Sequence, residues 1–310
     1  TPNLIWEFGD DYPLFGETWD DKFDACLAGI RAAGDTHLIS IENVAEATSR
    51  YAQNGSASYP WGTANAQVNW LYEYNCAYLA VEDGYTEAAV HSKPDLVNCR
   101  MDGWYDNMQS QAVETVELFM RKSFWWSLSS GSRGYMYGNN DLITWPVGAV
   151  GSNILAGTGG AYMLPSAMNT IWNTFASLRG WHHLVPDTAS ALVTAGRGTR
   201  ATEFAPGGGS IYNGTPNTYV SASKTADGTL AVIYIPAHAT ITVNGSLMQA
   251  GYTASWVDPA SGTVTAATTG PTYNSTSKGS NSAGDADWLL VLQGSTPGTA
   301  VKFSASMGSS

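Results

Sequence analysis

The chain has 310 residues and a formal net charge of −12, and only 13% of its residues are charged. A chain this acidic is unsuited to binding phosphate groups, which argues against nucleic acids and against anionic membrane surfaces. No apolar run in the sequence approaches the roughly 20 residues that a membrane-spanning helix needs. The 12 Trp and 33 Gly residues, in a chain with so little charge, favour a secreted protein that handles neutral polymers.

Residues 1–195 alternate short apolar runs with segments of helical periodicity. We expect strands at 3–9, 37–42, 68–76, 93–99 and 134–138, and helices at 18–34, 77–89, 112–131 and 166–180. Strands that alternate with helices in this way are typical of parallel βα units.

The helical periodicity disappears in the last third of the chain. Short apolar runs separated by Gly, Pro, Asp and Asn predict strands within 218–236, 239–246, 252–268 and 287–294. This pattern is typical of an antiparallel β-sandwich. Because the Gly-rich segment 195–210 is the expected linker, we expect one domain over 1–195 and a β-sandwich domain over 196–310.

Five βα units fit poorly with the common parallel folds. A (β/α)₈ barrel needs eight strands. An open sheet of five strands usually carries a Gly-rich phosphate loop after its first strand. Here the first apolar run is followed by Gly9, Asp10 and Asp11, and two carboxylates at this position would repel a phosphate.

Several segments of the chain resemble the apiosidase-like glycoside hydrolases, in order and in spacing. Residues 121–146, "RKSFWWSLSSGSRGYMYGNNDLITWP", are similar to an aromatic-rich helix that ends in Ser-Gly and leads into a strand with Gly-His-x-Tyr-Gly. Residues 2–11, "PNLIWEFGDD", look like the family's fourth barrel strand, and 93–106, "KPDLVNCRMDGWYD", look like the seventh. Three further segments are similar to helix four with strand five, to the barrel-closing segment and to a small β-sandwich named for collagen binding: 29–42, 179–187 and 254–263.

The resemblance implies a fold for each part of the chain. Residues 1–195 would be the C-terminal portion of a (β/α)₈ TIM barrel, strands four to eight, followed by an antiparallel β-sandwich. Five strands cannot close an eight-stranded barrel, and an unclosed sheet leaves backbone groups unpaired at its edges. We therefore expect a second polypeptide to supply strands one to three.

Cleavage of a glycosidic bond needs two carboxyl groups, one to protonate the leaving oxygen and one to attack or to activate water. The resemblance implies that Asp11 is the general acid/base, with Asp10 as the alternative, and that Asp102 is the nucleophile. The family has Glu at the position of Asp102, and the shorter side chain would retract the attacking oxygen by roughly one C–C bond. Glu42, at the end of a predicted strand, is the reserve carboxylate. For each acid, the alternative is an ordinary turn or strand-end residue.

Aromatic and polar side chains near these acids are the expected sugar-binding residues, because flat rings cover the apolar faces of sugars while polar edges bind hydroxyl groups. They are Asn43, Trp61, Trp104, Tyr105, Asp106, Tyr135, Tyr137 and Trp145. For each aromatic residue, the alternative is packing in the hydrophobic core. Trp125 and Trp126 lie in a predicted helix, where adjacent residues cannot both face one groove, so we expect core packing for them at least in part.

The sequence predicts neither a cofactor nor a metal site, because no His, Cys and Asp cluster has the spacing of metal ligands. Three cysteines allow one disulfide with one thiol left over, or three thiols. They are Cys26, Cys76 and Cys99. Sequons for N-glycosylation occur by chance in a chain rich in Ser, Thr and Asn, so they support secretion only weakly. They start at Asn54, Asn213, Asn244 and Asn274.

The sequence thus predicts a secreted glycoside hydrolase that acts on a polysaccharide or glycan, with a retaining mechanism. Retention needs a carboxyl separation of ~5–5.5 Å, whereas ~6.5–9.5 Å corresponds to inversion. One alternative is a catalytically inactive protein on the same scaffold that binds carbohydrate or matrix, which the change from Glu to Asp at position 102 motivates. Another is a structural subunit of an extracellular assembly.

Overall fold

The computed structural model describes residues 4–12, 19–43, 60–72, 76–90, 97–101, 116–136, 165–201 and 217–295. The first part, here named the parallel region, contains β1 (Ile5–Tyr12), α1 (Asp20–Ala32), β2 (Leu38–Asn43), α2 (Pro60–Asn65), β3 (Val68–Tyr72), α3 (Ala77–Val90), β4 (Val97–Met101), α4 (Val116–Ser129), β5 (Gly134–Tyr135) and α7 (Pro165–Ala176). The second part, the antiparallel region, contains η2 (Trp181–His183), β6 (Val185–Pro186), β7 (Val193–Ala195), β8 (Ser221–Lys224), β9 (Leu230–Ile235), β10 (Thr240–Val243), η4 (Gly245–Leu247), β11 (Thr253–Val257), β12 (Val264–Ala267), β13 (Thr272–Asn274), η5 (Ser275–Lys278) and β14 (Trp288–Gln293). None of the described helices is both long and apolar enough to span a bilayer.

The strands of the parallel region follow one another in chain order. β1 pairs with β2, and β3 pairs with β4, which pairs with β5, all in parallel. Between these two groups, the backbone N–H of Gln67 donates to the carbonyl of Ile39 at 2.9 Å. The Gln67 side chain in turn accepts from the backbone N–H of Ile39 at 2.8 Å. β3 therefore lies next to β2, and the prediction of parallel βα units is confirmed.

The antiparallel region consists of two sheets that share a core. The larger sheet has the strand order β12-β11-β14-β9-β8-β6, and the smaller has the order β13-β10-β7. Ile233 and Leu290 of the larger sheet pack in one core with Ile241 and Tyr273 of the smaller. Because β6 and β7 precede residue 196, the strand pairing of this region extends across the domain boundary expected from the sequence.

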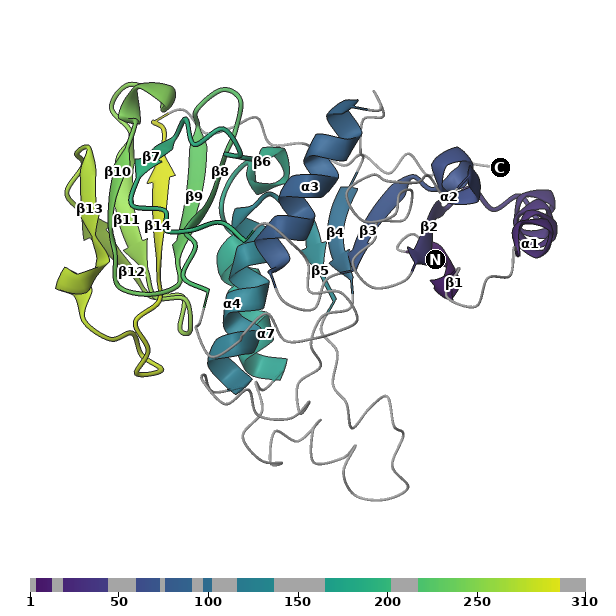
Figure 1. The fold of residues 1–310 in the computed structure, drawn as a ribbon, viewed down its shortest axis with the longest axis horizontal. Coiled ribbons are helices and arrows are strands. Elements are labelled where there is room, and N and C mark those ends of the chain that lie inside the picture. Colours follow the sequence, from purple (N-terminus) through teal and green to yellow (C-terminus); the bar gives the residue numbers. More distant parts are fainter. Residues whose placement is uncertain are drawn as a thin grey trace, which may run out of the picture.

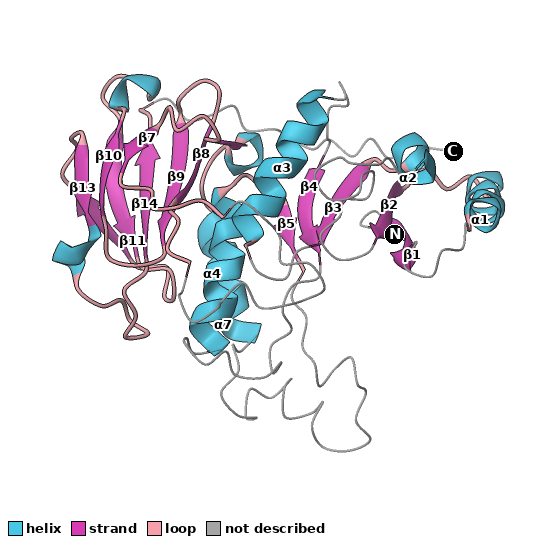
Figure 2. Ribbon diagram, viewed as in Figure 1, coloured by secondary structure: helices cyan, strands magenta, loops and turns pink. Residues whose placement is uncertain are grey.

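Helices α3, α4 and α7 lie between the strands of the two regions (Figure 1). The side of the larger sheet that faces away from the smaller sheet packs on these helices, as the separation of helix and strand layers also shows in Figure 2. Successive side chains of a strand point to opposite faces. Along β9, three residues accordingly join the core with the helices and three join the core with the smaller sheet: Leu230, Val232 and Tyr234, and Ala231, Ile233 and Ile235.

Helix α4 is buried along most of its length and connects the two regions. Trp125 and Trp126 are both buried, which confirms the prediction of core packing. The indole N–H of Trp125 donates to the carbonyl of Pro259 at 3.0 Å, and that of Trp126 donates to the carbonyl of Tyr219 at 2.9 Å. The two rings therefore bond to different segments of the antiparallel region, as expected for adjacent residues of a helix.

Candidate functional site

The carboxyl ends of β1 and β2 bring four of the predicted site residues together. Gly9 pairs with Glu42 and Tyr12 pairs with Asn43, so the register shifts between these two pairs. Asp10 and Asp11 are the extra residues of a β-bulge in β1. Bulges are enriched next to active sites, where they change the direction of a strand and of its side chains.

Gly9 makes this bulge possible. Its φ angle of 106° lies in the region that favours glycine. A Cβ atom at this position would lie 2.3 Å from the carbonyl oxygen of Glu42, which is closer than any van der Waals contact. The sequence Gly-Asp-Asp is therefore a structural unit, in which the glycine permits the pairing that places two aspartates at the strand end.

The two faces of this pair of strands differ. Trp6 and Phe8 of β1 pack with Phe23 of α1 in a small core, together with the buried Ile41 of β2. Alternation along β2 places the half-buried Glu42 on the opposite face. The face that carries Glu42 is thus the one turned away from α1.

Trp61 lies in helix α2 within a stretch that the sequence predicts as loop. Its side chain is only 4% exposed, and its indole N–H donates to Asp24 Oδ1 at 2.8 Å. Its ring lies 4.9 Å from that of Phe8 and 5.1 Å from that of Phe23. This placement corrects the expected loop position and favours core packing over contact with a sugar.

Tyr135, a second predicted sugar contact, ends β5. Its ring lies 4.4 Å from that of Phe124 in α4, and its hydroxyl donates to Ser123 Oγ at 3.3 Å. The side chain therefore lies on the helix side of the strand, where it packs between β5 and α4.

The remaining predicted residues fall outside what the structure describes in full. For Asp10, Asp11 and Asn43 only the backbone is described, and β4 ends at Met101 immediately before Asp102. Six predicted residues lie outside the described ranges: Asp102, Trp104, Tyr105, Asp106, Tyr137 and Trp145. In the described part of the chain, no group of three or more His, Cys, Asp or Glu residues could hold a metal ion.

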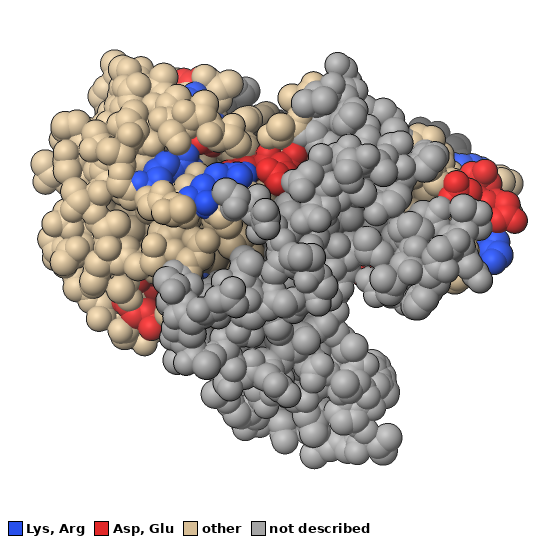
Figure 3. All heavy atoms as spheres, viewed as in Figure 1, with Lys and Arg blue, Asp and Glu red and all other residues tan. Residues whose placement is uncertain are grey.

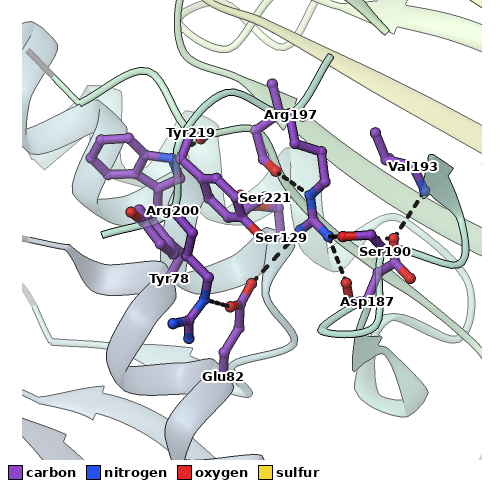
Figure 4. Close-up of polar contacts among 12 residues, drawn as sticks. Tyr78, Glu82, Ser129, Asp187, Ser190, Val193, Arg197, Arg200, Tyr219 and Ser221 are labelled. Atoms are coloured by element: carbon purple, nitrogen blue, oxygen red, sulfur yellow. Dashed lines mark hydrogen bonds and ion pairs between the residues drawn. The ribbon is translucent and has the colours of Figure 1, made fainter. Parts of the chain in front are cut away.

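A buried charged network that the sequence did not predict joins α3 to the antiparallel region (Figure 4). Arg200 Nε donates to Glu82 Oε2 at 2.7 Å, and Arg200 Nη2 donates to Asp83 Oδ1 at 3.1 Å. Arg197 Nη2 lies 3.8 Å from Glu82 Oε1. Burial raises the pKa of Glu82, while the hydrogen bond and charge of Arg200 act in the opposite direction. On the face drawn in Figure 3, basic and acidic side chains lie next to one another between the two regions.

Backbone contacts fix this network in place. Arg197 Nη1 donates to the carbonyl of Asp187 at 2.6 Å, and Arg197 Nε donates to the carbonyl of Val220 at 3.0 Å. The Arg197 guanidinium also lies 4.8 Å from the ring centre of Tyr219. Burial raises the pKa of Tyr219 to about 12, so its hydroxyl stays neutral at ordinary pH. The charged groups of the network contact one another and the backbone. The network therefore links α3 to the antiparallel region.

A second buried network joins α4 to the segment before β14. Arg121 Nε and Nη2 donate to the two carboxylate oxygens of Asp287 at 3.0 and 2.9 Å, and Nη2 donates to Asp285 Oδ2 at 2.6 Å. The hydroxyl of Tyr234 also donates to Asp287 at 2.9 Å. Burial by itself lowers the pKa of Arg121, but the hydrogen bonds and charge of Asp287 outweigh it and raise the pKa.

A sequence signal for these networks does exist. Arg121 and Lys122 interrupt the apolar or small-residue stretch 118–129 of α4, and Glu82 and Asp83 interrupt the stretch 77–85 of α3. Charged residues inside an apolar helix are almost never fully buried unless they are paired. The sequence therefore indicates buried pairs, although it does not indicate the partners.

Comparisons with known proteins agree with this architecture. A sequence model of the family described as "Putative collagen-binding domain of a collagenase" matches residues 209–293. A search of curated proteins finds no match. A solved structure described as "Glycoside hydrolase" is similar with a TM-score of 0.62 over 95% of this chain, at 18% identity. A glycoside hydrolase of family 5 from Bacteroides vulgatus is similar with a TM-score of 0.60 over 94% of this chain, at 15% identity.

These similarities define the class of fold. The chain covers 65% and 63% of the two solved proteins, which is less than two thirds of each. At such low sequence identity the likeness concerns the fold alone, and one fold can host many functions. The chain therefore has a glycoside-hydrolase-like fold of mixed α/β type with antiparallel sheets, and any activity has to be argued from the site.

Proposed function

We propose that this protein is a secreted glycoside hydrolase that acts on a polysaccharide or other glycan. The observation that supports the proposal is the backbone register of β1 and β2, in which Asp10 and Asp11 lie between the pairs Gly9–Glu42 and Tyr12–Asn43 of a glycoside-hydrolase-like fold. Catalytic residues of βα barrels lie at this end of the strands.

We assign the role of general acid/base to Asp11 and that of nucleophile to Asp102, in a retaining mechanism. Asp11 lies at the end of β1, and Asp102 directly follows β4. Parallel strands end at the same edge of a sheet, which supports a shared pocket. β1 and β4 are three strands apart, so at about 4.8 Å per strand they would be separated by ~14 Å along a flat sheet. The assignment therefore requires the sheet to curve as in a barrel, so that the two carboxylates face each other across its interior.

Glu42 is the alternative partner for Asp11. It lies one strand away, about 4.8 Å along the sheet, on the face turned away from α1. This pair would need no strong curvature. Single substitutions of Asp102 and Glu42 distinguish the two assignments.

We further propose that the parallel region is the C-terminal part of a (β/α)₈ barrel whose sheet continues beyond β1. Among the described strands, β1 pairs with β2 and with no other. Ile5 and Leu38, which are register partners, are 39% and 37% exposed. Parallel sheets are usually covered on both faces, so this face is suited to further βα units.

A hydrolysis screen on neutral plant and microbial glycans tests the catalytic proposal. The protein with its whole barrel is compared with its Asp11→Asn, Asp102→Asn and Glu42→Gln variants. We expect a loss of at least ~10²-fold in turnover for Asp11→Asn, as is usual for a missing acid/base group. We expect a similar loss for Asp102→Asn or for Glu42→Gln, depending on which residue is the nucleophile. Asp21→Asn, an exposed position in the first turn of α1, is the control. Full activity in all three variants would refute the assignment.

The alternative function is a non-catalytic protein that binds carbohydrate or matrix. The family description matched by residues 209–293 favours it. Pull-down of the intact protein on immobilised collagen and on insoluble glycans, with no hydrolysis across the whole screen, would support this alternative over the enzyme.

A further inference from the structure

A cavity of about 310 Å³ lies between helix α7 and the larger antiparallel sheet, beside the β11–β12 hairpin. One wall is polar and is formed by Asn173, Thr174 and Ser177 at the C-terminal part of α7 and just beyond it. The opposite wall includes Val257 and Val264 of the hairpin. Among the described residues that line the cavity none is charged, so they offer no counter-charge to a charged ligand.

The polar wall is suited to ligands with hydroxyl groups. Ser177 follows Asn173 by four residues and Thr174 by three, so its side chain lies next to both of theirs at the end of the helix. The hydroxyl of Thr174 donates to the carbonyl of Thr170, and that of Ser177 donates to the carbonyl of Thr174, both at 2.7 Å. With their protons engaged, both hydroxyl oxygens retain acceptor capacity for hydroxyl protons of a ligand. The exposed amide of Asn173 offers both a donor and an acceptor.

The apolar wall extends from the core to the surface. Val257 and Val264 are register partners, so both lie on the side of the sheet that faces the helices. Val257 is buried, whereas Val264 is 62% exposed. Its aliphatic side chain therefore gives the cavity an apolar surface on the solvent side.

The hairpin that forms this wall is held firmly. Gly262 has a φ angle of 73°, and a Cβ atom there would lie 2.4 Å from Thr174 Oγ1, so the hairpin approaches α7 as closely as a glycine permits. The Asp258 carboxylate accepts hydrogen bonds from the backbone N–H groups of Ala260 and Ser261. The Trp125 indole anchors the adjacent carbonyl of Pro259. The cavity is therefore preformed, as ligand sites usually are.

We propose that this cavity binds one neutral sugar ring of a glycan, as an accessory site formed by elements other than the strand ends of β1, β2 and β4. An uncharged cavity with one polar and one apolar wall matches a sugar ring, which has hydroxyl groups at its edge and C–H groups on its faces. Its volume is at the lower end of the ~300–1,000 Å³ typical of ligand sites. The choice of a glycan as the ligand class rests on the proposed function, whereas the location of the site does not.

Calorimetric titration of the Asp11→Asn variant, which separates binding from hydrolysis, tests the proposal. The probes are neutral pentasaccharides of glucose, xylose, mannose and arabinose, with penta-galacturonate as the charged comparison. We expect binding of at least one neutral probe and at least tenfold weaker binding of the charged probe. No binding of any neutral probe at millimolar concentration, or preference for the charged probe, would overturn the proposal.

Three variants in the same Asp11→Asn background then locate the binding. Ser177→Phe fills the cavity, and Val264→Asp places a charge at its mouth on a side chain exposed enough to leave folding intact. We expect each to weaken binding at least tenfold, with Thr253→Val, an exposed position at the other end of β11, leaving it unchanged. Unchanged affinity in Val264→Asp would overturn the site, even if Ser177→Phe failed to fold. With Asp11 restored, Val264→Asp should still hydrolyse a short soluble substrate, which distinguishes failure of this site from failure of the catalytic assignment.

Discussion

The larger antiparallel sheet and the strands β1 and β2 of the parallel region are covered to very different extents. Side chains on both faces of β9 are fully buried, one face by the smaller sheet and the other by α3, α4 and α7. β1 has one face packed under α1, while Ile5 and Glu7 on the other face are exposed. The junction between the regions is therefore deeply buried, whereas the proposed catalytic end lies on strands with one open face.

Substitution of Arg121 is expected to have the largest effect. Arg121→Met leaves Asp287 buried without its counter-charge, and removal of one partner of a buried ion pair costs about 3–5 kcal/mol. Chemical denaturation should show this loss in the free energy of unfolding. Because the junction connects both regions, the transition should broaden or divide as β1–β5 and the antiparallel region become uncoupled.

The control for this prediction is Glu117→Gln. Glu117 lies 3.6 Å from the same arginine but is half exposed, so its loss should change the free energy of unfolding by less than ~1 kcal/mol. A cost below 1 kcal/mol for Arg121→Met as well would mean that the junction does not stabilise the protein.

The next effect is expected at the bulge of β1. Gly9→Ala forces a Cβ atom against the carbonyl of Glu42 at a positive φ angle, and such strain costs roughly 2–3 kcal/mol. We expect lower thermal stability together with a loss of hydrolysis, because the bulge positions Asp10 and Asp11. Gly29→Ala in α1 meets no atom within 4 Å and should be neutral or slightly stabilising, since alanine is the better helix former. Equal effects at both glycines would contradict the role of the bulge.

The pH dependence of stability is expected to have opposite signs at two carboxylates of the parallel region, Asp35 between α1 and β2 and Glu82 in α3. A backbone hydrogen bond from His37 lowers the pKa of Asp35 from 3.8 to about 2, so the stabilisation by Asp35 is present above pH ~4 and is lost as the pH falls towards 2. Burial raises the pKa of Glu82 above 4.5, so its contribution is most favourable below that pH and becomes less favourable as the pH rises beyond it.

Denaturation at several pH values gives the free energy of unfolding of the native chain and of each variant. The difference between the two, followed against pH, tests these signs. The advantage of the native chain over Asp35→Asn should grow between pH 2 and pH 4, and its advantage over Glu82→Gln should shrink above pH 4.5. Slopes of the same sign for both variants would contradict either the hydrogen bonding of Asp35 or the burial of Glu82.

The smallest effect is expected for Asp83→Asn. Asp83 neighbours Glu82 and bonds the same arginine at 3.1 Å, but both side chains of this pair are more than a third exposed. Solvent-exposed ion pairs contribute about 0–1 kcal/mol. A cost as large as that of Glu82→Gln at neutral pH would indicate that the whole network, rather than its buried part, holds α3 to the antiparallel region.

Local patterns were sufficient to predict much of the fold. Alternating apolar runs and helical periodicity identified all five parallel strands, because both signals arise from neighbouring residues. Helix α2 was missed, because it lies in a stretch rich in Ser, Gly and Asn. The extension of β1 to Tyr12 was missed for a related reason, since the Gly9 bulge continues the strand through residues that read as a turn.

The candidate site was predictable only in part. Asp10, Asp11, Glu42 and Asn43 were singled out as strand-end residues, and the register of β1 and β2 brings their backbones together. Trp61 was assigned to the site because nothing in the local sequence showed that Asp24, 37 residues away, would accept its indole N–H. The partners of Arg121 and Glu82 lie more than 100 residues away in the sequence, and no periodicity indicates pairs at such separations.

The ion pair between Arg121 and Asp287 cannot form until synthesis of the chain has passed Asp287. The two residues are 166 positions apart, which corresponds to a delay of roughly 8–33 s at the usual ~5–20 residues per second of translation. For the first part of that interval α4 lacks Tyr219 and Tyr234, which contact Trp126, and Pro259, which accepts from Trp125. We expect the nascent parallel region to remain a client of chaperones until β14 has left the ribosome.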